Sequence, residues 1–96
     1  MSGERWPVLV TRRLPQPALD RIAGKTTMTL YEGDGAMPRD QLLAEVKGKV
    51  GAVTLLTDKV DDEFLDAAGD QLVIVANFAV GFDNIDVPAC TRRGIL

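Results

Sequence analysis

Short apolar runs rich in β-branched residues recur along this chain at nearly even spacing, and each pair is separated by a stretch with helical periodicity. The runs begin near Val8, Thr27, Val50, Leu72 and Ile95. Strands that alternate with helices in this way are typical of βα units, whose strands form a parallel sheet with helices on its faces. The sequence therefore predicts an α/β fold with a parallel sheet.

The pattern within each run predicts where its strand lies in the sheet. Residues 8–11 are apolar on both faces, which indicates a central strand covered on each side. Residues 27–31 alternate polar and apolar, as an edge strand does, whereas residues 50–56 and 72–76 predict buried strands. Residues 95–96 have the character of the first positions of a fifth strand. We therefore expect a sheet that is truncated at the start of its fifth strand, and a natural gene product that is longer.

Helix boundaries are marked by proline, aspartate and glycine. Helices are expected to open at Pro15, at Pro38, at Asp61 and at Asp86 or Pro88, because these residues suit a first turn or a cap. Each expected helix stops at a glycine, and these glycines are Gly24, Gly48, Gly69 and Gly94.

Composition excludes several classes of function. The net charge of -3 argues against binding the nucleic-acid backbone, which requires a basic face. The chain has no histidine, which removes the usual general base and the commonest soft-metal ligand, so no metal site is expected. No apolar stretch is long enough for a membrane span. Cys90 is the only cysteine, which fits a reducing cytoplasm, and we expect it to be a small packing residue.

The segment Ala79, Val80 and Gly81 is the best candidate for a binding site. It follows an expected buried strand and precedes an expected helix, and ligands of open α/β sheets bind outside the carboxyl ends of strands. Successive backbone N–H groups in such a turn can form a concave site for an anion such as a carboxylate or phosphate. Gly81 would equally well relieve a tight turn, and the spacing alone does not decide between these interpretations.

Two other motifs are incomplete. The segment 33–38 begins like a dinucleotide fingerprint, but Pro38 stands where the third glycine is needed, so a plain turn is expected. The segment 83–86 begins like a calcium loop but lacks the later glycine and glutamate, so its residues are interpreted as turn and N-cap residues.

Four segments carry a resemblance to a known family: VLVTR at 8–12, LLTDKVD at 55–61, ANFAVGFDNID at 76–86 and TRRGI at 91–95. In their order and spacing they resemble the N-terminal part of the D-isomer-specific 2-hydroxyacid dehydrogenases, nearest the glyoxylate and hydroxypyruvate reductase branch. The resemblance covers the whole chain and is most specific at 79–86. Phe82, where tyrosine is usual, and Pro88 and Cys90 depart from the family pattern.

The resemblance implies a flavodoxin-like substrate domain spanning residues 1–96, normally followed by a Rossmann domain that binds NADH or NADPH. By analogy, the backbone N–H groups of Val80 and Gly81 would hold the carboxylate of a small 2-oxoacid, and Leu56 would contact its small carbon end. The catalytic arginine, glutamate and histidine of the family would lie beyond Leu96, so this chain carries no catalytic residue and is expected to be inactive alone. The full-length form is expected to be a cytoplasmic homodimer.

A hypothesis from another class is a stand-alone flavodoxin-like binding module or receiver-type signalling module. Asp58 stands where a receiver carries its phosphorylated aspartate, but Arg12 and Arg13 occupy positions where a receiver needs acidic residues. A third expectation concerns behaviour only: an exposed sheet edge would lead the fragment to self-associate.

Overall fold

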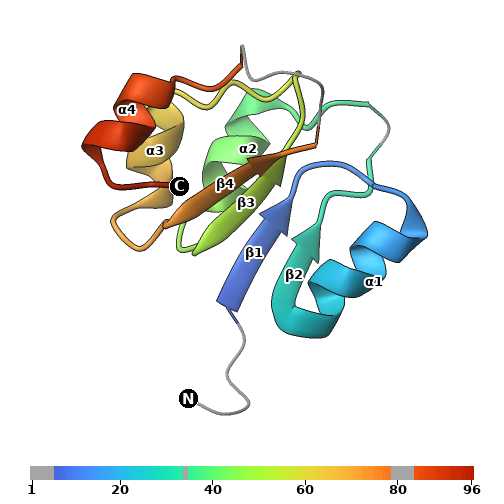
Figure 1. Cartoon of the computed structure of the whole chain (residues 1–96). Coiled ribbons are helices and arrows are strands. Elements are labelled where there is room, and N and C mark those ends of the chain that lie inside the picture. Colours follow the sequence, from blue (N-terminus) through green and yellow to red (C-terminus); the bar gives the residue numbers. More distant parts are fainter. Residues whose placement is uncertain (1–5, 34, 79–83) are drawn as a thin grey trace.

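The computed structural model describes residues 6–33, 35–78 and 84–96. Strands and helices alternate strictly along these residues (Figure 1). Their bounds are β1 (Trp6–Val10), α1 (Gln16–Lys25), β2 (Thr26–Leu30), α2 (Arg39–Val46), β3 (Gly51–Thr54), α3 (Asp62–Ala68), β4 (Ile74–Asn77) and α4 (Val87–Arg92). The alternation confirms the predicted α/β class.

The strands form one parallel sheet in the order β2-β1-β3-β4. β1 lies between β2 and β3, and both Leu9 and Val10 are completely buried, so the predicted central strand is confirmed. β2 pairs only with β1 among the described strands, which confirms its predicted place at an edge. Each crossover returns the chain to the same end of the sheet, so all four strands point their carboxyl ends the same way.

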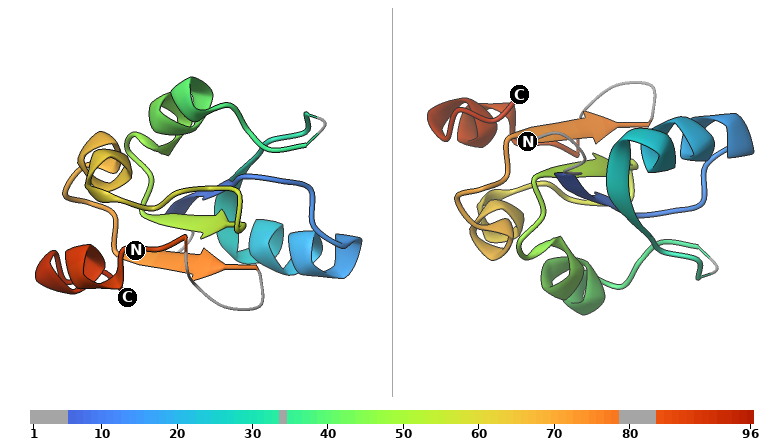
Figure 2. Two further views of the ribbon diagram at one scale, coloured as in Figure 1. Left: turned by 90° about the horizontal axis from the view of Figure 1, so that it is seen from above. Right: turned by 90° about the horizontal axis from the view of Figure 1, so that it is seen from below.

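Successive side chains of a strand point to opposite faces of the sheet, and the two faces are covered by different helices. Leu9 and Ala52 belong to a core that also contains buried side chains of α2, α3 and α4. Val10 belongs to a second, smaller core with Leu14 and Leu19 of the α1 region. Figure 2 shows α1 on one side of the sheet and α2 and α3 on the other. The predicted helices on both faces are therefore confirmed.

The face of the sheet against which α1 packs is only partly covered. The core beneath α1 contains side chains of β1, β2 and β3 but, within the described part of the chain, none of β4. Ile74 is 45% exposed and Ala76 is also exposed, although the run 72–76 predicted a buried strand. That prediction was wrong for one face, because α1 does not reach across to β4.

Most predicted helix limits are observed. Asp61 caps α3 by accepting the N–H of Phe64 at 3.0 Å, and Asp86 caps α4 by accepting the N–H of Ala89 at 3.0 Å. Gly69 ends α3 with φ of 96°, a conformation that favours glycine.

Gly24 does not end α1, contrary to the prediction. The helix continues to Lys25, and β2 begins at the next residue. The carbonyl of Ile22 accepts hydrogen bonds from both the N–H and the hydroxyl of Thr26, the latter at 2.7 Å. Thr26 therefore ends the helix without a glycine turn.

The two later strands also differ from prediction at their ends. β3 stops at Thr54 instead of Leu56, because the N–H of Asp58 turns back to the carbonyl of Leu55 at 2.9 Å. Leu96 donates its N–H to Val73 at 3.0 Å and accepts the N–H of Val75 at 2.9 Å. These two bonds have the pattern of a parallel strand beside β4 and agree with a fifth strand starting at this position.

Candidate functional site

A polar network lies at the carboxyl ends of β1, β3 and β4, the end of a parallel sheet where ligands normally bind. It joins the turn at residues 55–58, which carries the predicted site residue Leu56, to residues 77 and 84, which flank the segment that carries the predicted site residues Val80 and Gly81. We call this set of side chains the carboxyl-end network; its members are Thr11, Thr54, Asp58, Asn77 and Asn84.

The buried carboxylate of Asp58 organises the turn at 55–58. It accepts hydrogen bonds from the hydroxyl of Thr11 and, at 2.9 Å, from the N–H of Leu55. Asp58 is only 2% exposed and Thr11 only 1%. A buried carboxylate is tolerated when donors replace the water that it loses, so these bonds fix the turn against the end of β1.

Two asparagine amides meet at the end of β4. The amide nitrogen of Asn77 donates to the side-chain oxygen of Asn84 at 2.9 Å, and the nitrogen of Asn84 lies 3.2 Å from the side-chain oxygen of Asn77. The buried hydroxyl of Thr54 donates to the same Asn77 oxygen at 2.9 Å. The chain positions on either side of 78–83 are thereby held next to each other.

Asn84 also connects the end of β4 to the turn at 55–58. Its amide nitrogen donates to the carbonyl oxygens of Leu55 at 3.0 Å and Asp58 at 2.8 Å. Its own carbonyl accepts the N–H of Val60 at 2.8 Å, in an isolated parallel bridge between Val60 and Ile85. Asn84 thus contacts both segments of the carboxyl-end network.

Leu56 lies in the turn at 55–58 and is 52% exposed. An exposed leucine at the carboxyl end of a strand is accessible to a small ligand, which is the position that its predicted role requires. Val80 and Gly81, the other two predicted site residues, lie outside the described residues.

Thr54, Asn77 and Asn84 were not predicted as site residues. Asn84 was interpreted only as a turn residue, and Thr54 was placed inside a longer strand. Thr54 and Asn77 are polar side chains at the last positions of β3 and β4, and Asn84 lies shortly before α4, all of which are positions visible in the sequence. The contacts among these three side chains are not visible in the sequence, because the contacts depend on strand order and register.

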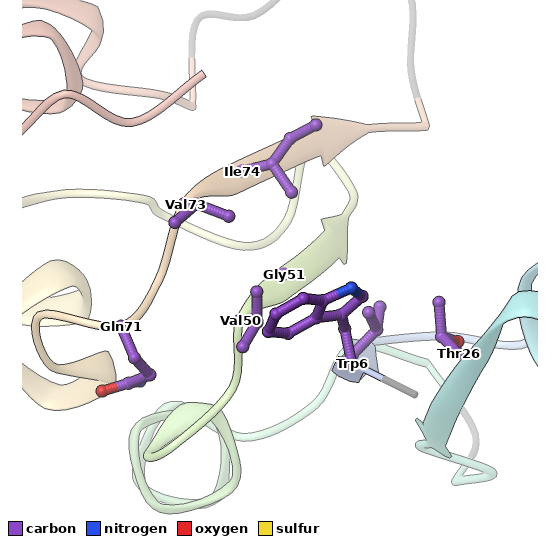
Figure 3. A pocket seen from close by; sticks show the side chains of 8 residues that line it. Trp6, Thr26, Val50, Gly51, Gln71, Val73 and Ile74 are labelled. Carbon is purple, nitrogen blue, oxygen red and sulfur yellow. The ribbon is translucent and has the colours of Figure 1, made fainter. Parts of the chain in front are cut away.

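A large hollow lies at the opposite end of the sheet. It has a volume of about 410 Å³, and its lining includes Trp6, Thr26, Gly51 and Ile74, the first residues of the four strands (Figure 3). Figure 3 shows the Trp6 ring beside Val50, and the lining offers almost no polar surface. This hollow is a part of the sheet face that α1 leaves uncovered, at the end of the sheet remote from the carboxyl-end network.

Charged side chains near α3 and α4 form ion pairs that connect neighbouring helices. Arg39 donates to Asp61 at 2.6 Å and to Glu63 at 3.0 Å, which ties the start of α2 to the start of α3. Burial alone would raise the pKa of the Asp61 carboxyl, but the hydrogen bonds from the Phe64 N–H and from Arg39 outweigh burial and lower it. Arg93 pairs with Asp66 at 2.8 Å, between α4 and α3.

The described residues contain no group of three or more His, Cys, Asp or Glu side chains that could hold a metal ion. Cys90 is buried, as predicted, and burial raises the pKa of its thiol. None of the helices in ranges 6–33, 35–78 and 84–96 has the length and apolar character needed to cross a membrane.

Comparisons with known proteins agree with the geometry. Residues 8–96 match the model of the catalytic domain of the D-isomer specific 2-hydroxyacid dehydrogenases. The chain is 40% identical over 88 residues to a glyoxylate reductase of Pyrococcus furiosus, covering 92% of this chain and 26% of that protein. It therefore spans about a quarter of the length of such relatives.

Solved structures show the same similarity. A protein of Thermus thermophilus superposes with a TM-score of 0.81 at 37% identity, over 93% of this chain and 28% of that one. An NADPH-dependent glyoxylate/hydroxypyruvate reductase of Sinorhizobium meliloti, solved in complex with NADP and malonate, superposes with a TM-score of 0.65 at 27% identity, over 97% of this chain and 27% of that one.

Proposed function

Because the chain belongs to the D-isomer specific 2-hydroxyacid dehydrogenases, as the match of residues 8–96 shows, we propose that it forms part of the domain that binds a small 2-oxoacid. We propose glyoxylate or hydroxypyruvate as that 2-oxoacid. The observation that supports this choice most directly is the 40% identity to a glyoxylate reductase over nearly the whole chain. The S. meliloti reductase adds support, since its complex contains malonate, a small carboxylate.

In this proposal the backbone N–H groups of Val80 and Gly81 bind the carboxylate, and Leu56 contacts the small carbon end. Three observations support the assignment. The segment directly follows β4 at the carboxyl end of the sheet, where ligands of α/β folds bind. Asn77 and Asn84, which flank it, are hydrogen-bonded to each other, and Asn84 also donates to the carbonyl of Leu55 in the turn that carries Leu56. Leu56 itself is exposed.

The rest of the reaction is assigned to the part of the relatives that this chain does not span. NADH or NADPH would supply the hydride when bound there, and an acid there would protonate the carbonyl oxygen. The residues of this chain would hold and orient the 2-oxoacid only. We therefore propose residues 1–96 as a substrate-binding domain portion that is inactive alone, so that NADPH and glyoxylate give no turnover above background with it.

Binding can be tested on the chain itself by NMR titration. With ¹⁵N-labelled protein, glyoxylate should shift the amide signals of Val80, Gly81 and Leu56, whereas glycolaldehyde, which lacks the carboxylate, should not. Val80→Pro removes one proposed N–H donor and should weaken binding, and Val80→Ala keeps the donor and should bind as the parent does. Equal shifts with both compounds, or no shifts with either, would contradict the proposal.

The receiver-type alternative is not supported by the surroundings of Asp58. A phosphorylated aspartate must be accessible to its phosphodonor, and Asp58 is 2% exposed and bonded to Thr11 and Leu55. Acetyl phosphate should therefore fail to label it. The cytoplasmic location, the homodimer of the full-length protein and self-association of the fragment remain predictions from the sequence.

A further inference from the structure

Asn84 makes more connections than a turn residue needs. A turn asparagine normally bonds to backbone groups close to it in sequence. The side chain of Asn84 instead bonds to Leu55, 29 positions away, to Asp58, 26 positions away, and to Asn77. These three partners belong to two different segments of the chain.

The contacts of Asn84 connect the 55–58 turn to the ends of β3 and β4. The side-chain nitrogen of Asn84 carries two hydrogens, and it reaches two carbonyl oxygens of the 55–58 turn at 2.8 and 3.0 Å. Its side-chain oxygen is occupied by the Asn77 amide at 2.9 Å. The side-chain oxygen of Asn77 in turn accepts a hydrogen bond from Thr54, so the contacts reach β3, the strand that leads into the turn.

Both segments joined by Asn84 are ones to which the proposed function assigns substrate contacts. Leu56 lies between the two carbonyls that Asn84 binds, and Val80 and Gly81 lie between Asn77 and Asn84 in the sequence. We propose that Asn84 is a positioning residue, which fixes the Leu56 turn relative to the ends of the carboxylate-binding segment without itself contacting the 2-oxoacid. This inference rests on the proposed function.

The chain offers a matched control at the other end of the sheet. The side-chain nitrogen of Gln71 also donates to two backbone carbonyls, that of Lys49 at 2.9 Å and that of Ala68. Asn84→Asp and Gln71→Glu therefore make the same chemical change, because each replaces a donating NH₂ group by a carboxylate oxygen that faces two carbonyls. Only the first change touches the carboxyl-end network.

Two measurements on the 96-residue chain test the inference. Amide hydrogen exchange, which needs no ligand, should be faster at residues 55–58 in Asn84→Asp and unchanged there in Gln71→Glu. NMR titration with glyoxylate should give a dissociation constant raised by about tenfold in Asn84→Asp and changed by less than about twofold in Gln71→Glu. Chemical denaturation of each variant gives the folded fraction, so that binding is compared between folded molecules.

The outcomes separate the two proposals. No glyoxylate-dependent shift in the parent chain overturns the proposed function, whereas parent-like binding by folded Asn84→Asp overturns the positioning role. Equal losses of affinity in Asn84→Asp and Gln71→Glu also overturn it, since the effect would then be one of general stability. If Asn84→Asp does not fold, Asn84→Ser applies the same criteria, because its short hydroxyl adds no charge and cannot reach both carbonyls.

Discussion

The hydroxyl of Thr11 donates a hydrogen bond to the carboxylate of Asp58, 47 positions later in the chain. Thr11 lies just after β1 and Asp58 lies in the turn after β3, and these two strands are neighbours in the sheet. The bond therefore joins the ends of two central strands and supports the turn that presents Leu56.

Removing this hydroxyl should destabilise the fold. Thr11→Val keeps the shape of the side chain but leaves a buried carboxylate with one donor fewer, which costs about 1–3 kcal/mol. Urea unfolding should show this loss. Thr27→Val, at an exposed position of β2, is the control and should change the free energy of unfolding by less than about 0.5 kcal/mol. Equal stabilities of the two variants would mean that the Thr11 hydroxyl is dispensable.

Asp61 should make stability depend on pH in the acid range. The pKa of its carboxyl is lowered in the folded chain from the ordinary value of 3.8, so the folded state favours the ionised form. Its stabilising contribution is complete above the unfolded value and is lost as the pH falls through the lowered folded value. Asp61→Asn should therefore be less stable than the parent at neutral pH. In urea titrations the difference should begin to shrink below about pH 3.8 and should vanish only below the lowered folded value.

Asp61→Ala separates the charge from the cap. It removes the acceptor for the Phe64 N–H as well as the charge, so it should cost about 1 kcal/mol more than Asp61→Asn at every pH. A constant difference between parent and Asp61→Asn across the titration would contradict the assigned role of ionisation.

Two residues close together near β4 should respond differently to truncation. Leu72 is 3% exposed and packs in the core with α2, α3 and α4, so Leu72→Ala should lower the free energy of unfolding by about 2–5 kcal/mol. Ile74 is 45% exposed on the uncovered face, so Ile74→Ala should cost about 1 kcal/mol. Equal costs in thermal or urea unfolding would show that something covers Ile74 in solution.

The thiol of Cys90 should react slowly in the folded chain. Burial is the main cause that raises the pKa of this thiol, and the negative charge of Asp86 raises it further. The positive charge of Arg93 acts in the opposite direction. Less thiolate and little access both slow attack on a disulfide reagent. Labelling at about pH 8 should be slow in buffer and fast in denaturant. Fast labelling in buffer would mean that α4 opens readily from the core.

Helix boundaries could be predicted from the local sequence where they depend on residues of a single helix. The caps at Asp61 and Asp86 were predictable because a capping bond reaches only three residues along the chain. The prediction at Gly24 was wrong because α1 continues past this glycine to Lys25. Thr26 then donates to the carbonyl of Ile22, and β2 begins at once. The sequence around Gly24 does not show that the connection is that short.

The carboxyl-end network could not be predicted from local pattern. Asn84 looks like any turn asparagine until β3 and β4 are placed side by side, since its partners at Leu55 and Asp58 come from a different unit of the fold. The exposed face of β4 was missed for a similar reason: the apolar run indicates burial, but the extent of α1 decides which side chains are covered. The position of residues 79–81 after a predicted strand indicated an anion site but did not exclude a plain tight turn, and the resemblance to a family supplied Leu56 and the roles predicted for Val80 and Gly81.

The four strands begin around an apolar hollow lined by Trp6 and Ile74, and three of them, β1, β3 and β4, end among Thr11, Asp58 and the two asparagines. In the proposed function, recognition of the 2-oxoacid therefore belongs to one end of the sheet, and the apolar hollow lies at the other. Descendants of such a chain could acquire new ligand preferences by substitutions at one rim of the sheet while selection at the other rim kept the architecture intact.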